Sequence, residues 1–599
     1  MPIDNVTITK VRVHNFRSLR LVEVNLNAVT VLIGENNAGK TGFLEAVFSA
    51  IGTGGKLLSE DDIYISADEN SPPKDREVVV DLLVKPVDEN GGVSESFPQG
   101  SPWLELWGNG IVQDDEDNDF VGIRMLMSWD RIKGDYFIQR RFLREWKANI
   151  EEMMDAETVQ QVTQVTAAQL APLSLYYLDA KRDAAQEMKS KGSVWNKLIS
   201  DHGLSDDKVE EVEEKLNEIN DFLVSNSDAL THIKDHLTGV GNIVNCDSDN
   251  VSVNAVARKL RDLNRGVDVA LSTQDAPQFP LSKQGMGTRS LTSILLFRAY
   301  MTWRQQKQAA EALHPLVGVE EPEAHLHPQA QRSLFRHLVE TPGQKIVSTH
   351  SPYVCSQTSV DSFVHFCKLG QETVVSQFYD ENESVLDGDS IHKINRQVLN
   401  TRGELLFARC VVLFEGETEE QALPQFAHNY WGRHPNEVGV TFVAVGGAGS
   451  YLPFLRLVSR FKIPWVIFSD GEPDPVKKLD KALAKAGLAE SKDNENCIVL
   501  PDGKNFEQYV LSDDTLEAIQ TMIAELAIEA GKITDLTAVA GVRDTWHRKS
   551  KEEILKCLKS GKTKFGAKIA NAINGIADES KRIPACIKEA LDLAFAQDN

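Results

Sequence analysis

The sequence of 599 residues predicts an α/β fold made of two successive units. Apolar, strand-like segments alternate with segments of helical periodicity along most of the chain, which is typical of parallel sheets with crossover helices. The alternation starts near residue 6, is interrupted by a charged segment at residues 183–265, and restarts near residue 400. A composition of 42% hydrophobic and 25% charged residues is ordinary for globular domains and excludes gross disorder and disulfide-dense scaffolds.

The first unit opens with strands and a helix. Residues 6–16 and 22–34 have the β-branched residues and two-residue alternation of strands, and residues 41–51 have apolar side chains at helical spacing. Residues 77–86 and 135–143 are further strand-like segments. Together these segments predict a sheet domain with at least one helix.

The charged segment at residues 183–265 lacks proline and predicts a helical hairpin that could serve as a dimerisation arm. A pair of solvated surface helices explains the same pattern equally well. A helix is expected at residues 288–312, and residues 314–352 read as a strand, a helix and a strand, which is a βαβ unit.

The second unit contains four short apolar strands separated by helical segments, and it ends in basic helices. This pattern predicts a smaller α/β domain. The expected boundaries are residues 1–182 and 266–400 for the first unit, 183–265 for its insertion, and 401–599 for the second unit with its C-terminal helices.

Several global signals are negative. No uncharged apolar segment is long enough to span a membrane, and the N-terminal residues do not have the pattern of a signal peptide. The seven cysteines are scattered without a CxxC pair, so a zinc site or disulfide framework is not expected. These features favour a reducing, cytoplasmic setting without a membrane partner.

A glycine-rich segment, GENNAGKT, matches the phosphate-binding pattern GxxxxGK[ST] and lies between an apolar strand and a helix. Backbone N–H groups of such a loop surround phosphates at a helix N-terminus. The lysine would hold the β- and γ-phosphates and the threonine hydroxyl would ligate Mg²⁺, whereas a chance glycine-rich turn is the alternative. The residues expected to bind nucleotide are Gly34, Asn36, Asn37, Gly39, Lys40 and Thr41.

Adjacent carboxylates, Glu320 and Glu321, end a later apolar strand. Because neighbouring side chains point in different directions, Glu320 could hold Mg²⁺ while Glu321 polarises the attacking water. His350 ends the next strand, where it could contact a γ-phosphate. An acidic turn and a structural histidine are the alternatives to these roles.

The segment LSKQGMGTRS at residues 281–290 precedes a long helix, where Ser282, Gly285 and Gly287 could offer hydrogen-bond donors to a phosphate. The order of phosphate loop, Ser/Gly loop, paired acids and histidine resembles the ABC-type ATPase heads of the RecF and SMC repair proteins. In such heads the nucleotide lies between two heads, and the Ser/Gly signature of one faces the phosphate loop of the other. LSKQGMG replaces the usual LSGGQ, Glu-Glu replaces Asp-Glu, and residues 55–75 contain no glutamine switch, so ATP binding is expected rather than rapid turnover.

Five carboxylates follow the apolar strands of the second unit. Glu415 and Glu419 follow the first of these strands, Asp470 and Glu472 follow the third, and Glu507 follows the fourth. Because the carboxyl ends of parallel strands meet at one edge of a sheet, we expect these side chains to lie together. Their repulsion would call for divalent cations, and oxygen ligands suit Mg²⁺ or Mn²⁺. Taken singly, each acid also fits a helix-start or turn role.

This order resembles the Toprim domain of topoisomerases, primases and some nucleases, which has a Glu after the first strand and then a DxD motif. Glu472 stands in place of the second Asp, and Asp474 is a possible substitute. An ABC-type head followed by Toprim resembles the nucleases of the overcoming-lysogenization-defect (OLD) family, which includes the Gabija anti-phage nuclease subunit. The resemblance implies ATP-regulated, Mg²⁺- or Mn²⁺-dependent DNA cleavage or nicking at a two-metal site, a homodimer or homotetramer, and a role in phage defence.

The resemblance also implies a helicase-type partner in some relatives and a basic residue near the metals. Within GKTKFGAKIANAI the best match is Lys564, with Lys562 and Lys568 as rivals, and an ordinary basic helix face is the alternative. A different class of function also stays open, namely a nucleotide-gated protein that binds DNA or a partner and has an inactive Toprim domain. The substitution at Glu472 motivates that alternative.

The formal net charge of −24 argues at first against a nucleic-acid partner. The charge is unevenly distributed, since residues 401–599 hold 25 Lys/Arg and 29 Asp/Glu. Residues 541–570 hold nine Lys/Arg and three Asp/Glu. We therefore expect DNA to lie along the second unit and the acidic first unit to repel it.

Overall fold

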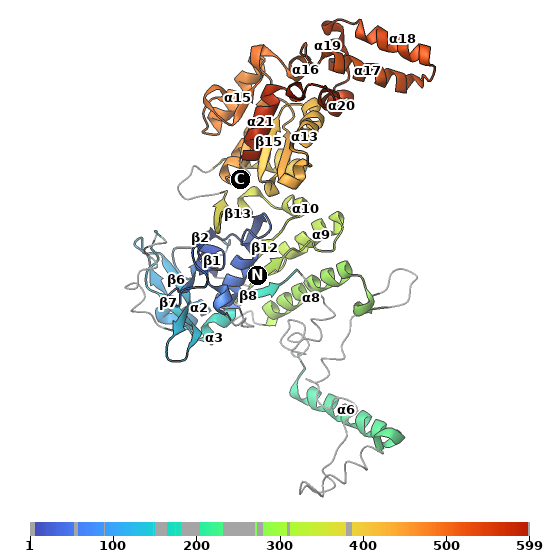
Figure 1. Ribbon diagram of the computed structural model, residues 1–599. Coiled ribbons are helices and arrows are strands. Elements are labelled where there is room, and N and C mark those ends of the chain that lie inside the picture. Colours follow the sequence, from blue (N-terminus) through green and yellow to red (C-terminus); the bar gives the residue numbers. More distant parts are fainter. Residues whose placement is uncertain are drawn as a thin grey trace.

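The computed structural model describes residues 6–52, 58–88, 90–147, 149, 152, 164–173, 175–180, 204–231, 270–271, 279–307, 312–378 and 386–596. Figure 1 shows the first unit, which ends near residue 400, with the second unit stacked at one end of it. The helix α6 (Asp206–Asn226) stands away from the rest of the described chain. Most of the expected insertion at 183–265 lies outside the described residues, so the hairpin stays a prediction.

An antiparallel sheet forms one layer of the first unit, with strand order β2-β1-β4-β6-β5 and β7 paired to β6. Valine-rich β4 is buried on both faces and forms the centre of this layer. The buried pair of Asp81 and Arg124, 2.7 Å apart, joins β4 to β6 within it. The strands are β1 Val6–Phe16, β2 Leu19–Asn25, β4 Val78–Pro86, β5 Val112–Gln113, β6 Asp119–Asp130 and β7 Asp135–Leu143.

A second sheet carries the phosphate loop and has the order β14-β13-β3-β12-β11-β8. Its strands are parallel except for β14, which pairs antiparallel with β13. Helix α9 (Pro328–Val339) joins β11 to its parallel neighbour β12, which confirms the predicted βαβ unit. The strands are β3 Val29–Gly34, β8 Leu175–Leu178, β11 Leu316–Glu320, β12 Gln344–Ser348, β13 Phe363–Leu369 and β14 Glu372–Gln377.

The prediction of a single strand at residues 22–34 is wrong. The segment splits into the end of β2 and the whole of β3, because β2 belongs to the antiparallel sheet and β3 to the parallel one. The chain crosses between the layers at residues 26–28, where Leu26 N donates to Thr9 O at 2.8 Å. The remaining elements of the first unit are α1 Lys40–Ile51, α2 Pro102–Trp107, α3 Ala167–Leu170, β9 Ala270–Leu271, β10 Phe279–Pro280, α8 Met286–Lys307, α10 Pro352–Cys355, α11 Gly388–Ile394 and α12 Asn400–Arg402.

The second unit has a parallel sheet of order β16-β15-β17-β18, with all four predicted strands present. Its strands are β15 Cys410–Phe414, β16 Val440–Ala444, β17 Trp465–Ser469 and β18 Cys497–Val499. Its helices are α13 Glu417–Trp431, α14 Tyr451–Arg460, α15 Pro473–Lys485, α16 Phe506–Val510, α17 Leu516–Gly531, α18 Leu536–His547, α19 Lys551–Ser560, α20 Lys562–Asn574 and α21 Ala585–Ala596.

Strand β15 shows how the two units are joined. Its alternate residues face two different cores, because successive side chains of a strand point to opposite faces. Cys410, Val412 and Phe414 pack with helices α13, α20 and α21. Val411 and Leu413 belong to a core that continues into the first unit. The second unit is therefore packed against the first over apolar surface.

Two further observations concern the described part of the chain. No helix there is long and apolar enough to cross a membrane. The six cysteines within it are all unpaired.

Candidate nucleotide and metal sites

The phosphate loop follows β3 and leads into α1, as the sequence predicts. Gly34 has a φ of +129°, and an added Cβ there would lie 2.0 Å from Phe366 O on neighbouring β13. Gly39 has a φ of +103°, a conformation that favours glycine. The buried Lys40 side chain folds back on the loop, and its Nζ donates to the carbonyl oxygens of Gly34 at 2.9 Å and Glu35 at 2.6 Å. The loop geometry is therefore fixed by close backbone packing.

The structure brings Thr41 and Glu320 together at the start of α1. The Thr41 hydroxyl donates to Glu320 Oε1, and the Tyr177 hydroxyl donates to Glu320 Oε2 at 2.8 Å. Glu321 has a left-handed backbone conformation with a φ of 42°, and its N–H donates to Ser348 O at 2.9 Å. The charge of Glu321, like that of Glu320, acts on Lys40 of the phosphate loop. Tyr177 was not predicted from the sequence.

His350 follows β12 and packs its ring 5.9 Å from the Phe407 ring. Burial, and then the charge of Lys40, lower the pKa of His350 to about 4, which leaves its imidazole neutral at pH 7. Glu323 accepts hydrogen bonds from His350 N at 2.7 Å and Thr349 Oγ1 at 2.8 Å, and burial raises the pKa of its carboxyl. Glu323 thus holds the backbone at His350, and it was not predicted from the sequence.

The Ser/Gly loop lies at the start of α8. Ser282 and Gly285 are exposed, so they are open to a second molecule. Gly287 packs on the loop after the paired acids, where an added Cβ would lie 2.6 Å from His325 O. The Ser/Gly loop therefore contacts the loop that follows Glu320 and Glu321 within one chain.

The five predicted carboxylates of the second unit lie around the carboxyl ends of β15, β17 and β18. Glu415 directly follows β15, and Glu419 is buried in the first turn of α13. Asp470 follows β17, Glu472 caps α15, and Glu507 is buried on α16. Charge interactions link every one of the five to at least one other, so these side chains lie in one electrostatically coupled cluster.

Protein hydrogen bonds hold several of these carboxylates. Ser469 Oγ donates to Glu415 Oε1 at 3.0 Å, and Phe506 N donates to Asp470 Oδ1 at 2.9 Å. Thr418 Oγ1 donates to Glu507 Oε1 at 2.9 Å. Neither hydroxyl donor was predicted from the sequence. Each lies next to one of the predicted acids, and serine or threonine beside a strand end is too common to single out.

Burial and mutual repulsion disfavour the charged forms of these acids. Burial, and then the neighbouring Asp470, raise the pKa of Glu419 to about 8. Burial, and then Glu415, raise the pKa of Asp470 to about 7. The pKa of Glu415 is also raised, again chiefly by burial. The cluster is short of positive charge, and a bound cation would relieve this directly.

The carboxyl-rich donor set suits Mg²⁺ or Mn²⁺, since both prefer oxygen ligands. Among the described residues, no three His, Cys, Asp or Glu side chains already form a metal cage. The carboxylates would therefore have to turn from their present hydrogen bonds to hold metal. Asp474, the possible substitute, lies apart on the surface of α15, where it is 75% exposed and pairs with Lys478 at 2.6 Å.

The predicted basic residues lie on α20, which crosses the first turn of α13. An added Cβ at Gly566 would lie 2.7 Å from Thr418 O, so this glycine permits the close crossing. Lys564 is exposed, with Nζ 5.6 Å from the centre of the Phe565 ring, and it forms no ion pair within the described chain. Lys568 instead lines a groove against α17, and the side chain of Lys562 lies outside the description.

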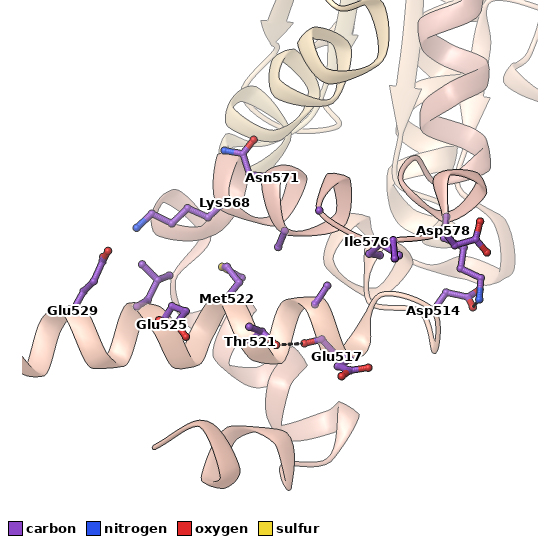
Figure 2. Close-up of a pocket in the computed structure, with 16 residues that line it drawn as sticks. Asp514, Glu517, Thr521, Met522, Glu525, Glu529, Lys568, Asn571, Ile576 and Asp578 are labelled. Carbon is purple, nitrogen blue, oxygen red and sulfur yellow. Dashed lines mark hydrogen bonds and ion pairs between the residues drawn. The ribbon is translucent and has the colours of Figure 1, made fainter. Parts of the chain in front are cut away.

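That groove, with a volume of about 840 Å³, separates α17 from α20 (Figure 2). Glu517, Glu525 and Glu529 line its α17 side, and Lys568 lies on the α20 side. None of the five clustered carboxylates lines it. The groove is thus a feature of the C-terminal helices that is separate from the carboxylate cluster.

The segment that joins the units touches the phosphate loop. Arg409, just before β15, forms an ion pair with Glu35 of the loop, with Nε 2.8 Å from Oε1. Phe407, two residues earlier, is the residue that packs on His350. Arg402 pairs with Glu420 of α13 at 2.8 Å. Glu35 of the phosphate loop and His350 after β12 therefore both contact the segment that leads into Glu415.

Comparison with known proteins gives matches in both units. The family model of the AAA ATPase domain matches residues 7–54 and 135–355, which include the phosphate loop and the paired acids. The model of the overcoming lysogenization defect protein-like TOPRIM domain matches residues 406–471, which include Glu415 and Asp470.

Two curated relatives and one solved structure match different shares of the chain. Old nuclease of Escherichia phage P2 is 24% identical over 484 residues, which are 78% of this chain and 77% of that protein. OLD nuclease of Thermus scotoductus is 29% identical over 203 residues, which are 33% of this chain and 37% of that protein. The solved C-terminal region of the Burkholderia pseudomallei OLD protein is 22% identical, and the match covers 32% of this chain and all of that one with a TM-score of 0.24.

An ATPase domain that matches the AAA model is thus followed by an OLD-like Toprim domain, in the order that the sequence predicts. The homology to Old nuclease extends across both units. This chain is therefore similar to the proteins of the overcoming lysogenization defect family in both of its units.

Proposed function

We propose that the chain is a DNA nuclease in which a divalent-metal site on the Toprim domain cleaves DNA and the ATPase head regulates cleavage. The observation that carries this proposal is the cluster of five interacting carboxylates at one edge of the β15–β18 sheet. The relatives named as nucleases support the same activity.

The carboxylates would act by holding cations. Mg²⁺ or Mn²⁺, when bound, would activate a water and neutralise charge on the phosphodiester. Glu415, Glu419, Asp470, Glu472 and Glu507 are the proposed ligands. Lys564, exposed on α20, would offset negative charge on the transition state.

In the head, Lys40 would bind the β- and γ-phosphates and Glu320 would hold Mg²⁺ together with Thr41. Glu321 would orient the attacking water, and His350 would contact the γ-phosphate in its neutral form. Ser282, Gly285 and Gly287 would serve the phosphate loop of a second copy, so a homodimer or homotetramer is part of the proposal. The proposal also includes a role in phage defence and a helicase-type partner.

DNA would approach along α19 and α20. Three of the nine basic residues in 541–570 are already paired, since Arg543 contacts Glu525, Arg548 contacts Asp544 and Lys551 contacts Asp513. Lys556, Lys559 and Lys564 are exposed and form no ion pair within the described chain, so they remain available for phosphates.

The test is incubation of purified protein with supercoiled and linear DNA in Mg²⁺ or Mn²⁺, with and without ATP. We expect cleavage by the wild type and its loss in Glu415→Ala and Asp470→Ala. Asp474→Ala is the matched control, because this exposed acid pairs with Lys478 and should be dispensable. Undiminished cleavage in the first two variants would rule out this metal site.

The alternative is a nucleotide-gated DNA- or partner-binding protein with an inactive Toprim domain. The glutamate at position 472 and the lack of a preformed metal cage in the described chain favour it. No cleavage with any divalent metal, together with ATP-dependent DNA binding, would support this function.

A further inference from the structure

Tyr451 lies close enough to the carboxylate cluster for the charges of its acids to act on the phenol, although it belongs to none of the predicted motifs. It begins α14 and is fully buried in the core that joins the two units. The preceding loop is tied to the end of β15, because Val445 N donates to Phe414 O and Gly447 N donates to Glu415 O, both at 2.9 Å. The backbone next to Glu415 therefore fixes where the tyrosine enters.

Two glycines give this loop its shape. Gly446 and Gly447 have φ values of 80° and 106°, conformations that other residues rarely adopt. They turn the chain from β16 back towards β15 before α14 begins. The position of Tyr451 is thus set by backbone geometry rather than by its own hydroxyl.

The hydroxyl of Tyr451 lies in acidic surroundings. It makes no hydrogen bond of ordinary geometry within the described chain. Burial, and then the charges of Glu415 and Glu419, raise the pKa of this phenol, so it keeps its proton and can only gain by donating it. Its polar neighbour is Ser469, whose own hydroxyl donates to Glu415 Oε1 at 3.0 Å.

Ser469 has one proton and two possible acceptors. Besides Glu415, the carbonyl oxygen of Asp470 lies 3.2 Å from Ser469 Oγ. A donor to the serine oxygen strengthens the bond that the serine itself donates. The Tyr451 hydroxyl is in place to be that donor when the carboxylates rearrange around metal.

We propose that Tyr451 is a positioning residue of the carboxylate site, which orients Glu415 for metal through Ser469. This inference rests on the proposed metal site and adds to it a residue from outside the acidic motifs. A buried phenol that only fills space would be better replaced by phenylalanine, because an unbonded buried hydroxyl costs stability.

The positioning role predicts opposite changes in the stability and the Mn²⁺ affinity of Tyr451→Phe, whereas a space-filling role predicts no change in Mn²⁺ affinity. If the hydroxyl serves metal binding, the metal-free variant unfolds at the same or a higher temperature than the wild type, because an unsatisfied group is gone. Its Mn²⁺ affinity falls by about tenfold, at the lower end of what loss of an outer hydrogen-bond partner costs a metal site. Both are measured without catalysis, by thermal unfolding in EDTA and by electron paramagnetic resonance of free Mn²⁺.

Tyr430→Phe is the control, since it removes a hydroxyl that donates to Asp592 at 2.8 Å at the other end of α13. It should leave Mn²⁺ affinity unchanged. Ser469→Ala tests the relay independently, and combining it with Tyr451→Phe should weaken Mn²⁺ binding no further than Ser469→Ala alone.

The outcomes separate the two levels of the proposal. Wild-type Mn²⁺ affinity in Tyr451→Phe would overturn the role of Tyr451 and leave the metal site standing. Additive losses in the double variant would overturn the relay through Ser469. If the wild type binds no Mn²⁺, the metal site itself is wrong, and the role of Tyr451 falls with it.

Discussion

The two candidate sites of this protein differ in how their charges are balanced. In the nucleotide site, Lys40 is bonded to two loop carbonyls and Glu320 accepts from Thr41 and Tyr177. In the Toprim site, burial and the charges of neighbouring carboxylates raise the pKa values of both Glu419 and Asp470. The first site is organised before any ligand arrives, whereas the second holds repulsion that a cation would relieve. Bound metal should therefore contribute more to the stability of the Toprim site than to that of the nucleotide site.

The largest expected effect contrasts Asp470→Asn with Lys40→Ala. Loss of the aspartate charge should weaken Mn²⁺ binding and cleavage by more than about 100-fold, since ligands should matter more than the outer partners that cost 10–100-fold. It should also raise the unfolding temperature without metal, because repulsion is removed. Lys40→Ala should abolish ATP binding and leave Mn²⁺ affinity unchanged. Calorimetric titrations with ATP and with Mn²⁺ measure the two affinities. A loss of Mn²⁺ affinity in Lys40→Ala would contradict the separation of the two sites.

A smaller effect is expected from pH. The folded-state pKa values of about 8 for Glu419 and about 7 for Asp470 lie above the unfolded values near 4, so the folded state binds more protons in between. Stability should therefore fall as the pH rises from ~4 to ~8. His350 and His365, with pKa values of about 4, act oppositely, but only below the ordinary histidine pKa of 6.5.

Metal-free protein should accordingly lose stability between about pH 6.5 and pH 8, and Mn²⁺ should restore it. Denaturant unfolding in EDTA at both pH values measures the change. Glu419→Gln should flatten the dependence, whereas Glu417→Gln, an exposed neighbour in the same helical turn, should not. If the stability of Glu419→Gln falls with pH as steeply as that of the wild type, the Glu419 carboxyl is not the source of the pH dependence.

The candidate site residues that could be predicted from the sequence lie at strand ends or in the loop or helix that follows. Strand ends converge whatever the rest of the fold does, so the phosphate loop, the paired acids and the five Toprim acids could be placed from pattern alone. The strand at 22–34 was misjudged, because periodicity cannot show that two consecutive strands enter different sheets. Supporting residues were also missed, since their partners are remote in sequence: Tyr177 is 143 residues from Glu320 and Arg409 is 374 from Glu35.

The smallest expected effect concerns that last pair, which joins the phosphate loop to the Toprim domain. Both side chains are partly exposed, and such pairs are worth at most about 1 kcal/mol, so Arg409→Ala should change the ratio of cleavage rates with and without ATP by about two- to fivefold. Glu35→Ala should have the same effect, and the double variant should add nothing, because the ion pair is lost once. Arg20→Ala, which breaks an exposed pair with Glu372 inside the head, is the control. An unchanged ratio in Arg409→Ala would place the communication between the sites in the apolar contacts, such as Phe407 on His350, instead.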